Sequence, residues 1–146
     1  MHVFADVAEL MAHGADLGRS QWLVLDQERI HRYTTTAGGT PTGRGSRSAV
    51  RRVDDTTIHR YLALALIPLL SQQIWRVQVR FAVNAGLNKI RFGTPIPAGA
   101  RIQLDSALVS ARLLASGALV VINERIFTEH DPEPVVMAET LTLIRS

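Results

Sequence analysis

Apolar and polar residues alternate along several stretches in the second half of the chain, which is the pattern of half-buried β-strands. The clearest alternation covers residues 74–83, where Trp75, Val77 and Val79 are separated by Arg76 and Gln78. Residues 101–114, 118–128 and 135–144 predict three further long strands. The residues at 115–117 predict a hairpin, and the Pro-rich stretch 130–134 predicts another turn.

The first half of the chain predicts helices and one short strand. Residues 3–13 place apolar side chains on one helical face, and residues 21–25 are typical of a strand. Asp26 is a good N-cap for a helix that continues through Ile30 and Tyr33. Either Asp54 or Asp55 would cap a second helix that is apolar on most sides as far as Leu70. Pro68 predicts a kink or an early end of this helix.

One buried helix followed by about four long antiparallel strands predicts an α+β architecture. A single antiparallel sheet curled around a central helix satisfies this order of elements. The outer strands of such a sheet carry unpaired backbone groups. We therefore expect two copies of the chain to pair as a homodimer.

Length and composition narrow the class of protein. The 146 residues fit a single domain, 1–146, and 47% of them are hydrophobic, which excludes a disordered chain. The absence of cysteine excludes a disulfide scaffold, a thiolate metal site and a cysteine nucleophile. The longest apolar run, 62–70, is too short to cross a bilayer, and the first residues do not resemble a secretory signal. We expect a cytoplasmic protein without a membrane partner.

The formal net charge of +3 comes from one segment. Residues 34–55 form an atypical Thr/Gly/Arg-rich stretch that resembles an insert, and they include Arg44, Arg47, Arg51 and Arg52. Without these four, 12 basic and 13 acidic residues leave a charge of −1. Up to Arg52 the segment has no aromatic residue and no lysine, so it does not predict nucleic-acid binding. The histidines other than His59 lack partners at metal-ligand spacing, and no metal site is expected.

Several segments resemble one known family. Residues 84–92 (Asn-Ala-Gly-Leu-Asn-Lys-Ile-Arg-Phe) are followed by 95–102 (Pro-Ile-Pro-Ala-Gly-Ala-Arg-Ile). Together they are similar to the block after the first long strand of MaoC-like dehydratases, which include the (R)-specific enoyl-CoA hydratases. Residues 17–30 and 57–66 are similar to the opening and the central helix of the same family. The resemblance covers roughly 1–33 and 56–146.

This resemblance implies a hot-dog fold and a reaction on acyl thioesters. The family adds water across a trans-2-enoyl thioester, or removes it from a 3-hydroxyacyl thioester. An Asp and a His, spaced D-x4-H, hold and deprotonate the water in that family. Backbone N–H groups near the start of the central helix stabilise the thioester oxygen. The implied partner is an acyl-CoA or acyl-carrier thioester, and no cofactor is implied beyond this substrate.

The chain departs from the family at the catalytic positions. Gly39 stands at the Asp position and Arg44 at the His position. Neither can act as a general base, because glycine has no side chain and the arginine guanidinium stays protonated. Arg60 replaces the glycine near the thioester carbonyl. Three interpretations stay open. The chain is a non-catalytic thioester binder, it uses His59 or the aspartates 54 and 55 instead, or residues 34–55 are read out of frame after two compensating insertions or deletions.

The candidate site residues follow from this comparison. His59, near the start of the central helix, is the candidate catalytic residue, and a structural histidine at a helix start is the alternative. The substrate-binding candidates are Asn84, Gly86, Asn88, Lys89 and Arg91, which we expect on a turn after the strand 74–83. Lys89 and Arg91 would meet the phosphates of coenzyme A. A turn with satisfied side chains is the alternative for this group.

The resulting functional hypothesis is an (R)-specific enoyl-CoA hydratase or 3-hydroxyacyl thioester dehydratase of fatty-acid metabolism, with its activity in question because the D-x4-H dyad is absent. The alternative is a non-catalytic acyl-CoA-binding or partner subunit of a hydratase. A hot-dog thioesterase is a weaker enzyme alternative, since the 84–92 block resembles the hydratase branch.

Overall fold

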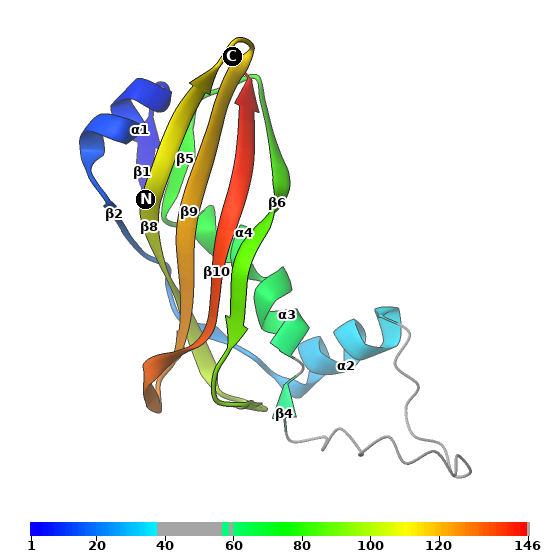
Figure 1. Ribbon diagram of the computed structural model, residues 1–146. Coiled ribbons are helices and arrows are strands. Elements are labelled where there is room, and N and C mark those ends of the chain that lie inside the picture. The colour runs from blue at the N-terminus through cyan, green and yellow to red at the C-terminus, as the bar shows by residue number, and fades with distance from the viewer. Residues whose placement is uncertain (38–56, 59, 146) are drawn as a thin grey trace.

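The computed structural model describes residues 1–37, 57–58 and 60–145 (Figure 1). The first part contains β1 (His2–Phe4), α1 (Val7–His13), β2 (Asp16–Arg19), β3 (Leu23–Val24) and α2 (Gln27–Thr36). The second part contains β4 (Thr57–Ile58), α3 (Arg60–Ala65), α4 (Ile67–Ser71), β5 (Trp75–Val77), β6 (Phe81–Phe92), β7 (Ile96–Pro97), β8 (Arg101–Leu114), β9 (Gly117–Thr128) and β10 (Asp131–Arg145). The sequence-based assignments at Gly39, Arg44, Asp54, Asp55 and His59 lie outside the described residues.

A six-stranded antiparallel sheet forms the body of the molecule. Its strand order is β2-β8-β9-β10-β6, and β3 pairs with another part of β8. A parallel pair, β1 and β5, and a short antiparallel pair, β4 and β7, lie beside this sheet. Helices α3 and α4 pack against one face, which we call the core face, and α2 lies next to α3 (Figure 1). The predicted α+β class, with a sheet wrapped on a central helix, is confirmed.

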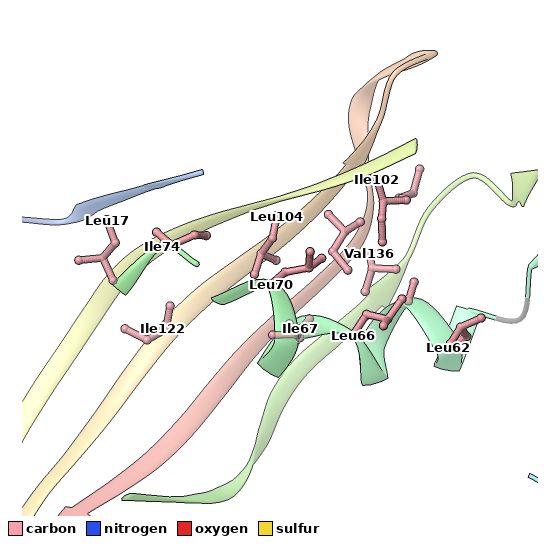
Figure 2. Packing of buried hydrophobic residues seen from close by; sticks show 14 of the residues in the cluster. Leu17, Leu62, Leu66, Ile67, Leu70, Ile74, Ile102, Leu104, Ile122 and Val136 are labelled. Atoms are coloured by element: carbon pink, nitrogen blue, oxygen red, sulfur yellow. The ribbon is translucent and has the colours of Figure 1, made fainter. Parts of the chain in front are cut away.

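The core lies between α3, α4 and the core face of the sheet. Leu62, Leu66 and Leu70 turn toward the sheet side chains (Figure 2). The sheet supplies Ile102 and Leu104 from β8, Ile122 and Ile126 from β9, and Val136 from β10, all fully buried. Full burial of one such side chain contributes about 1.5–3 kcal/mol. These contacts fix the central helix on the sheet.

Every second residue of β9 is buried, in agreement with the predicted alternation. The residues between them face the outer side of the sheet, where Arg125 bonds to Asp105 of β8. Directly paired residues of neighbouring strands share a face. The pairing therefore assigns a face to each residue of the sheet.

The predicted single strand 74–83 is wrong in its extent. The structure ends β5 at Val77 and begins β6 at Phe81, because the chain leaves its pairing with β1 and moves to the opposite edge, beside β10. The backbone N–H of Gln78 still donates to the carbonyl of Phe4 in β1 at 2.8 Å, so the chain leaves β1 after this residue. The predicted turn at 84–91 is also wrong, since these residues lie within β6.

The helix predictions are confirmed in part. Asp26 caps α2, and its Oδ1 accepts a hydrogen bond from the Arg29 N–H at 2.8 Å. The central helix predicted from Asp54 or Asp55 is wrong in its start, because Thr57 and Ile58 form β4 and α3 begins only at Arg60. The break predicted at Pro68 is present, since the helix divides into α3 and α4 at Leu66, with the proline in the first turn of α4. The helix expected from residue 3 begins only at Val7, since residues 2–4 pair with β5. Among the described residues, no helix is long and apolar enough to cross a membrane.

Candidate functional site

A pocket lies along the flank of the central helix, and we call it the apolar pocket. Its volume is about 300 Å³. It is lined by Tyr33 of α2, Tyr61, Leu64 and Ala65 of α3, Ile67 and Pro68 of α4, Asn84 and Leu87 of β6, and Thr140 of β10. Tyr61, Leu64, Ala65 and Pro68 are spaced by three and four residues, so they share one side of the helical segment. Leu62 and Leu66 occupy the buried side.

An irregularity in the sheet forms the opposite wall. Asn84 pairs with Thr142 and Gly86 pairs with Leu141, so β6 carries one extra residue between these pairs. Such a bulge lets Asn84 and Leu87, three residues apart, face the same side of the sheet. Gly86 has φ 155°, a conformation that side chains disfavour, and its N–H donates to the Asn84 Oδ1 at 3.1 Å. This contact orients the Asn84 amide at the pocket.

The polar groups of the apolar pocket are two phenols, an amide and a hydroxyl, from Tyr33, Tyr61, Asn84 and Thr140. The Tyr61 ring also packs on Phe92 with 5.5 Å between the centroids. Among the described lining residues there is no carboxylate and no imidazole. The described residues can therefore donate hydrogen bonds to a carbonyl oxygen, and they supply no strong general base.

A second pocket, which we call the charged pocket, also has Tyr33 in its lining. Its volume is about 420 Å³. It is lined by Asp26, Glu28, Arg29, Arg32, Tyr33 and Thr36 of the α2 region and by Leu62 of α3. Arg32 forms an exposed ion pair with Glu28, one helical turn away. The Nε of Arg29 is buried and has no hydrogen-bond acceptor.

The structure separates the five predicted substrate-binding residues. Asn84 lines the apolar pocket, and Gly86 positions it. Lys89 lies in a second bulge of β6 with φ 49°, and its Nζ bonds to Glu139 at 2.9 Å. Asn88 and Arg91 pair with Glu139 and Met137, which belong to the outer face of the sheet. Lys89 and Arg91 are therefore turned away from the apolar pocket.

Several lining residues were missed by sequence reasoning. Tyr61 and Leu64 could have been found from their helical spacing, since they lie on the side of the helix opposite its most buried residues. Tyr33 and Thr140 carry no such signal, because their place depends on how α2 packs and on the register of β10. The catalytic candidate His59 and the positions Gly39 and Arg44 lie outside the described residues.

Comparison with known proteins gives a family. The chain is 32% identical to 3-hydroxyacyl-thioester dehydratase Z of Mycobacterium tuberculosis, with 97% of each chain covered. The MaoC-like dehydratase from Rhodospirillum rubrum superposes with a TM-score of 0.66 at 11% identity, over 88% of this chain and 90% of that one. The C-terminally truncated 3R-hydroxyacyl-ACP dehydratase complex HadBC of M. tuberculosis gives 0.66 at 18% identity, over 87% and 93%. No family model matches the chain.

The curled antiparallel sheet, the central helix and the pocket beside it define a hot-dog protein. The fold neighbours share this architecture. With a relative at 32% identity over nearly its whole length, the chain belongs to the MaoC-like dehydratase family. The predicted family and fold are thus confirmed.

Proposed function

We propose that this protein binds an acyl thioester with its acyl part in the apolar pocket, and interconverts (R)-3-hydroxyacyl and trans-2-enoyl thioesters. One observation carries the proposal. The relative that matches 97% of the chain is named as a 3-hydroxyacyl-thioester dehydratase. The position of the pocket on the central helix supports it. Water-soluble thioester carriers are also consistent with a cytoplasmic location, which we propose together with the activity.

The chemistry is an elimination of water. The bond from the α-carbon to its hydrogen breaks, a carbon–carbon double bond forms, and the β-hydroxyl leaves with a proton as water. The reaction involves no net oxidation or reduction, which supports the expectation that no cofactor is needed besides the thioester. The enolate that develops on the thioester oxygen needs hydrogen-bond donors. We propose the Asn84 amide as one donor, because Gly86 already holds its oxygen and its NH₂ group is left to donate.

The general base has to come from outside the described lining residues. His59 directly precedes Arg60, the first residue of α3, in the sequence. Tyr61, the next residue, lines the apolar pocket. We propose His59 as the group that takes the α-proton, since histidine is the side chain most often used for proton transfer near neutral pH. Gly39 and Arg44 have no catalytic part in this scheme.

A second candidate function is a non-catalytic, thioester-binding partner subunit. It is favoured by the absence of a carboxylate or imidazole from the described lining of the apolar pocket. The residues at Gly39 and Arg44 favour it as well. One fold neighbour, HadBC, is itself described as a complex. In this function the protein binds the thioester or a catalytic partner and does not turn the substrate over.

The test is the loss of enoyl-thioester absorbance when the purified protein meets crotonyl-CoA and a longer trans-2-enoyl-CoA. We expect turnover, and we expect His59→Ala to lower it by about 10²–10⁴-fold. Turnover that survives this substitution would exclude His59 as the base. No turnover, combined with a rise in melting temperature on adding the thioester, would select the non-catalytic function.

A pocket variant tests where the thioester binds. Ala65 lines the apolar pocket and is exposed, so Ala65→Trp fills the pocket without entering the core. Leu113→Trp is the matched control, because Leu113 is 71% exposed at the far end of β8. We expect the first variant to lose thioester binding and the second to keep it. Equal binding by both variants would place the acyl group elsewhere.

We also propose that two copies pair along β6. Among the described strands, β6 pairs only with β10, and none of its twelve residues is buried. Phe81, Val83, Leu87 and Ile90 are 39–52% exposed. A long apolar edge strand associates with another strand unless something covers it. A second β6 in antiparallel orientation would cover these residues and continue the sheet.

Sedimentation of a charged double variant tests this pairing. We expect the unmodified protein to be a dimer, and Val83→Glu with Ile90→Glu to shift it to monomers. Val109→Glu is the control, since Val109 is 52% exposed on β8, away from this edge. A dimer that tolerates the double variant would show that β6 is not the interface. A monomeric unmodified protein would contradict the pairing itself.

A further inference from the structure

The apolar and charged pockets share one described lining residue. Tyr33 lines both. Tyr61 and Leu62, which are consecutive in α3, line one pocket each. A ligand with an apolar end and a charged arm could therefore occupy the two pockets together by passing Tyr33.

Arg29 is the unsatisfied group of the charged pocket. Its Nε is buried and bonds to no acceptor in the described part of the chain. A buried donor without a partner costs free energy that an incoming acceptor would recover. A guanidinium offers its Nε and one terminal nitrogen side by side, a geometry that matches two oxygens of a phosphate.

The acidic residues around Arg29 bond to groups other than its guanidinium. Asp26 caps α2, and its Oδ1 accepts from the Arg29 backbone N–H at 2.8 Å, not from the guanidinium. Glu28 pairs with Arg32, and this pair is largely exposed, with 70% and 77% of the two side chains accessible. An exposed pair of this kind is weak, so Arg32 can turn to a second anion at little cost.

The two cations expected to meet the carrier phosphates lie on the outer face of the sheet, away from the apolar pocket. Lys89 is paired with Glu139, and Arg91 belongs to the outer face through its pairing with Met137. Arg29 and Arg32, in contrast, line the charged pocket, which has Tyr33 in common with the apolar pocket.

We propose that the charged pocket is a phosphate subsite, in which Arg29, assisted by Arg32, binds a phosphate of the carrier arm whose acyl end occupies the apolar pocket. This assignment rests on the proposed function for its acyl end. The phosphate belongs either to coenzyme A or to a phosphopantetheine arm, which share this chemistry.

The experiment compares three crotonyl thioesters by calorimetry: those of coenzyme A, of phosphopantetheine and of pantetheine, which has no phosphate. We expect Arg29→Gln to weaken binding of the CoA ester by about 10-fold or more and to leave the pantetheine ester unchanged. Arg29→Lys keeps the charge without the fork of donors, and we expect an intermediate loss. Arg112→Gln removes an exposed arginine of β8 and is the control.

The three esters also identify the source of the phosphate. If the phosphopantetheine ester binds as tightly as the CoA ester, one phosphate of the arm is bound. If only the CoA ester gains affinity over the pantetheine ester, the nucleotide phosphates are bound. An Arg29→Gln variant that weakens both the CoA and pantetheine esters equally, or neither, would overturn the subsite.

A separate measurement keeps this assignment independent of the proposed function. Pyrophosphate and adenosine 3′,5′-bisphosphate, without any acyl group, are titrated against the unmodified protein and Arg29→Gln. We expect binding that the variant loses and Arg112→Gln keeps. No binding to the unmodified protein at millimolar ligand, or binding that Arg29→Gln retains, would overturn the subsite. If the free phosphates bind as expected and the pantetheine ester does not bind, the proposed function fails and the subsite stands.

Discussion

Ser106 of β8 and Glu124 of β9 are directly paired on neighbouring strands, and the Ser106 hydroxyl donates a hydrogen bond to the Glu124 carboxyl group. Both side chains are buried on the core face. Glu124 is 1% exposed, and among the described residues no cation bonds to it. Burial raises the pKa of Glu124 from 4.5 to about 7. The Ser106 hydrogen bond lowers this pKa, and the nearby charge of Asp105 raises it.

The raised pKa of Glu124 predicts that the protein loses stability as pH rises from 4.5 to about 7. In this window the unfolded chain has released the proton that the folded chain still holds, so raising pH favours unfolding. The loss is about 3 kcal/mol at most, from the pKa difference between the two states. Urea unfolding measured at intervals from pH 4 to pH 8 checks it.

Glu124→Gln is the matched control for this pH dependence. The amide keeps a polar group beside Ser106 and cannot ionise. We expect the variant to match the unmodified protein near pH 4 and to exceed it in stability near pH 8. Two parallel stability curves would show that Glu124 does not titrate in this range.

Two neighbouring leucines of α4 give the second prediction. Leu70 is 0% exposed in the core and Leu69 is 47% exposed. Leu70→Ala should lower the free energy of unfolding by about 2–5 kcal/mol, because it leaves a cavity. Leu69→Ala should change it by less than about 0.5 kcal/mol, as for most surface positions. Chemical denaturation distinguishes the two, and similar losses would contradict this placement of the helix.

The third prediction concerns Gly117, where the β8–β9 hairpin meets β10. Its φ is 146°, and a Cβ there would lie 1.9 Å from the Ile144 carbonyl oxygen. Gly117→Ala should lower the free energy of unfolding by ~1–3 kcal/mol or more, which is the cost of a strained backbone position. Ser116→Ala, one residue earlier, is the control. A melting temperature equal to that of the control would mean that the hairpin approaches β10 less closely.

The fourth prediction concerns Asp105 on the outer face. It accepts from the Arg19 Nε at 3.0 Å and from the Arg125 Nη2 at 2.6 Å, and both guanidinium groups lie 5.8 Å from the Phe127 ring centroid. Asp105→Ala leaves two unpaired cations together and should cost about 1–2 kcal/mol, since the arginines remain partly hydrated. Removing the exposed pair by Glu28→Ala should cost almost nothing. Unfolding of both variants at two salt concentrations checks this, and equal effects would contradict it.

Regular strands could be predicted because their side chains alternate. In β9 every second residue is buried, so the sequence itself shows which face meets the core. In β6 the two bulges break this rule, and nothing local to residues 84–91 indicates that they pair with β10. The conformation of these residues is set by a partner strand about fifty positions away, which pattern reasoning does not see.

The candidate site was predicted only where a motif marks it. Asn84 was found through the family block and does line the apolar pocket. Lys89 and Arg91 belong to the same block, yet the second bulge turns them outward. Tyr33 reaches the pocket only through the packing of α2 beside α3, a tertiary contact that leaves no mark in a single sequence.

The two bulges also make the length of β6 more constrained than its composition. Deleting Ala85 would remove the first bulge, and Asn84 and Leu87 could then no longer both point into the apolar pocket. A one-residue deletion here would shift one part of the strand by one position. In that part, side chains that face the core would turn to the outer face, and the outer ones would turn to the core. During divergence, or in a designed library, this segment should accept many substitutions while rejecting single insertions and deletions.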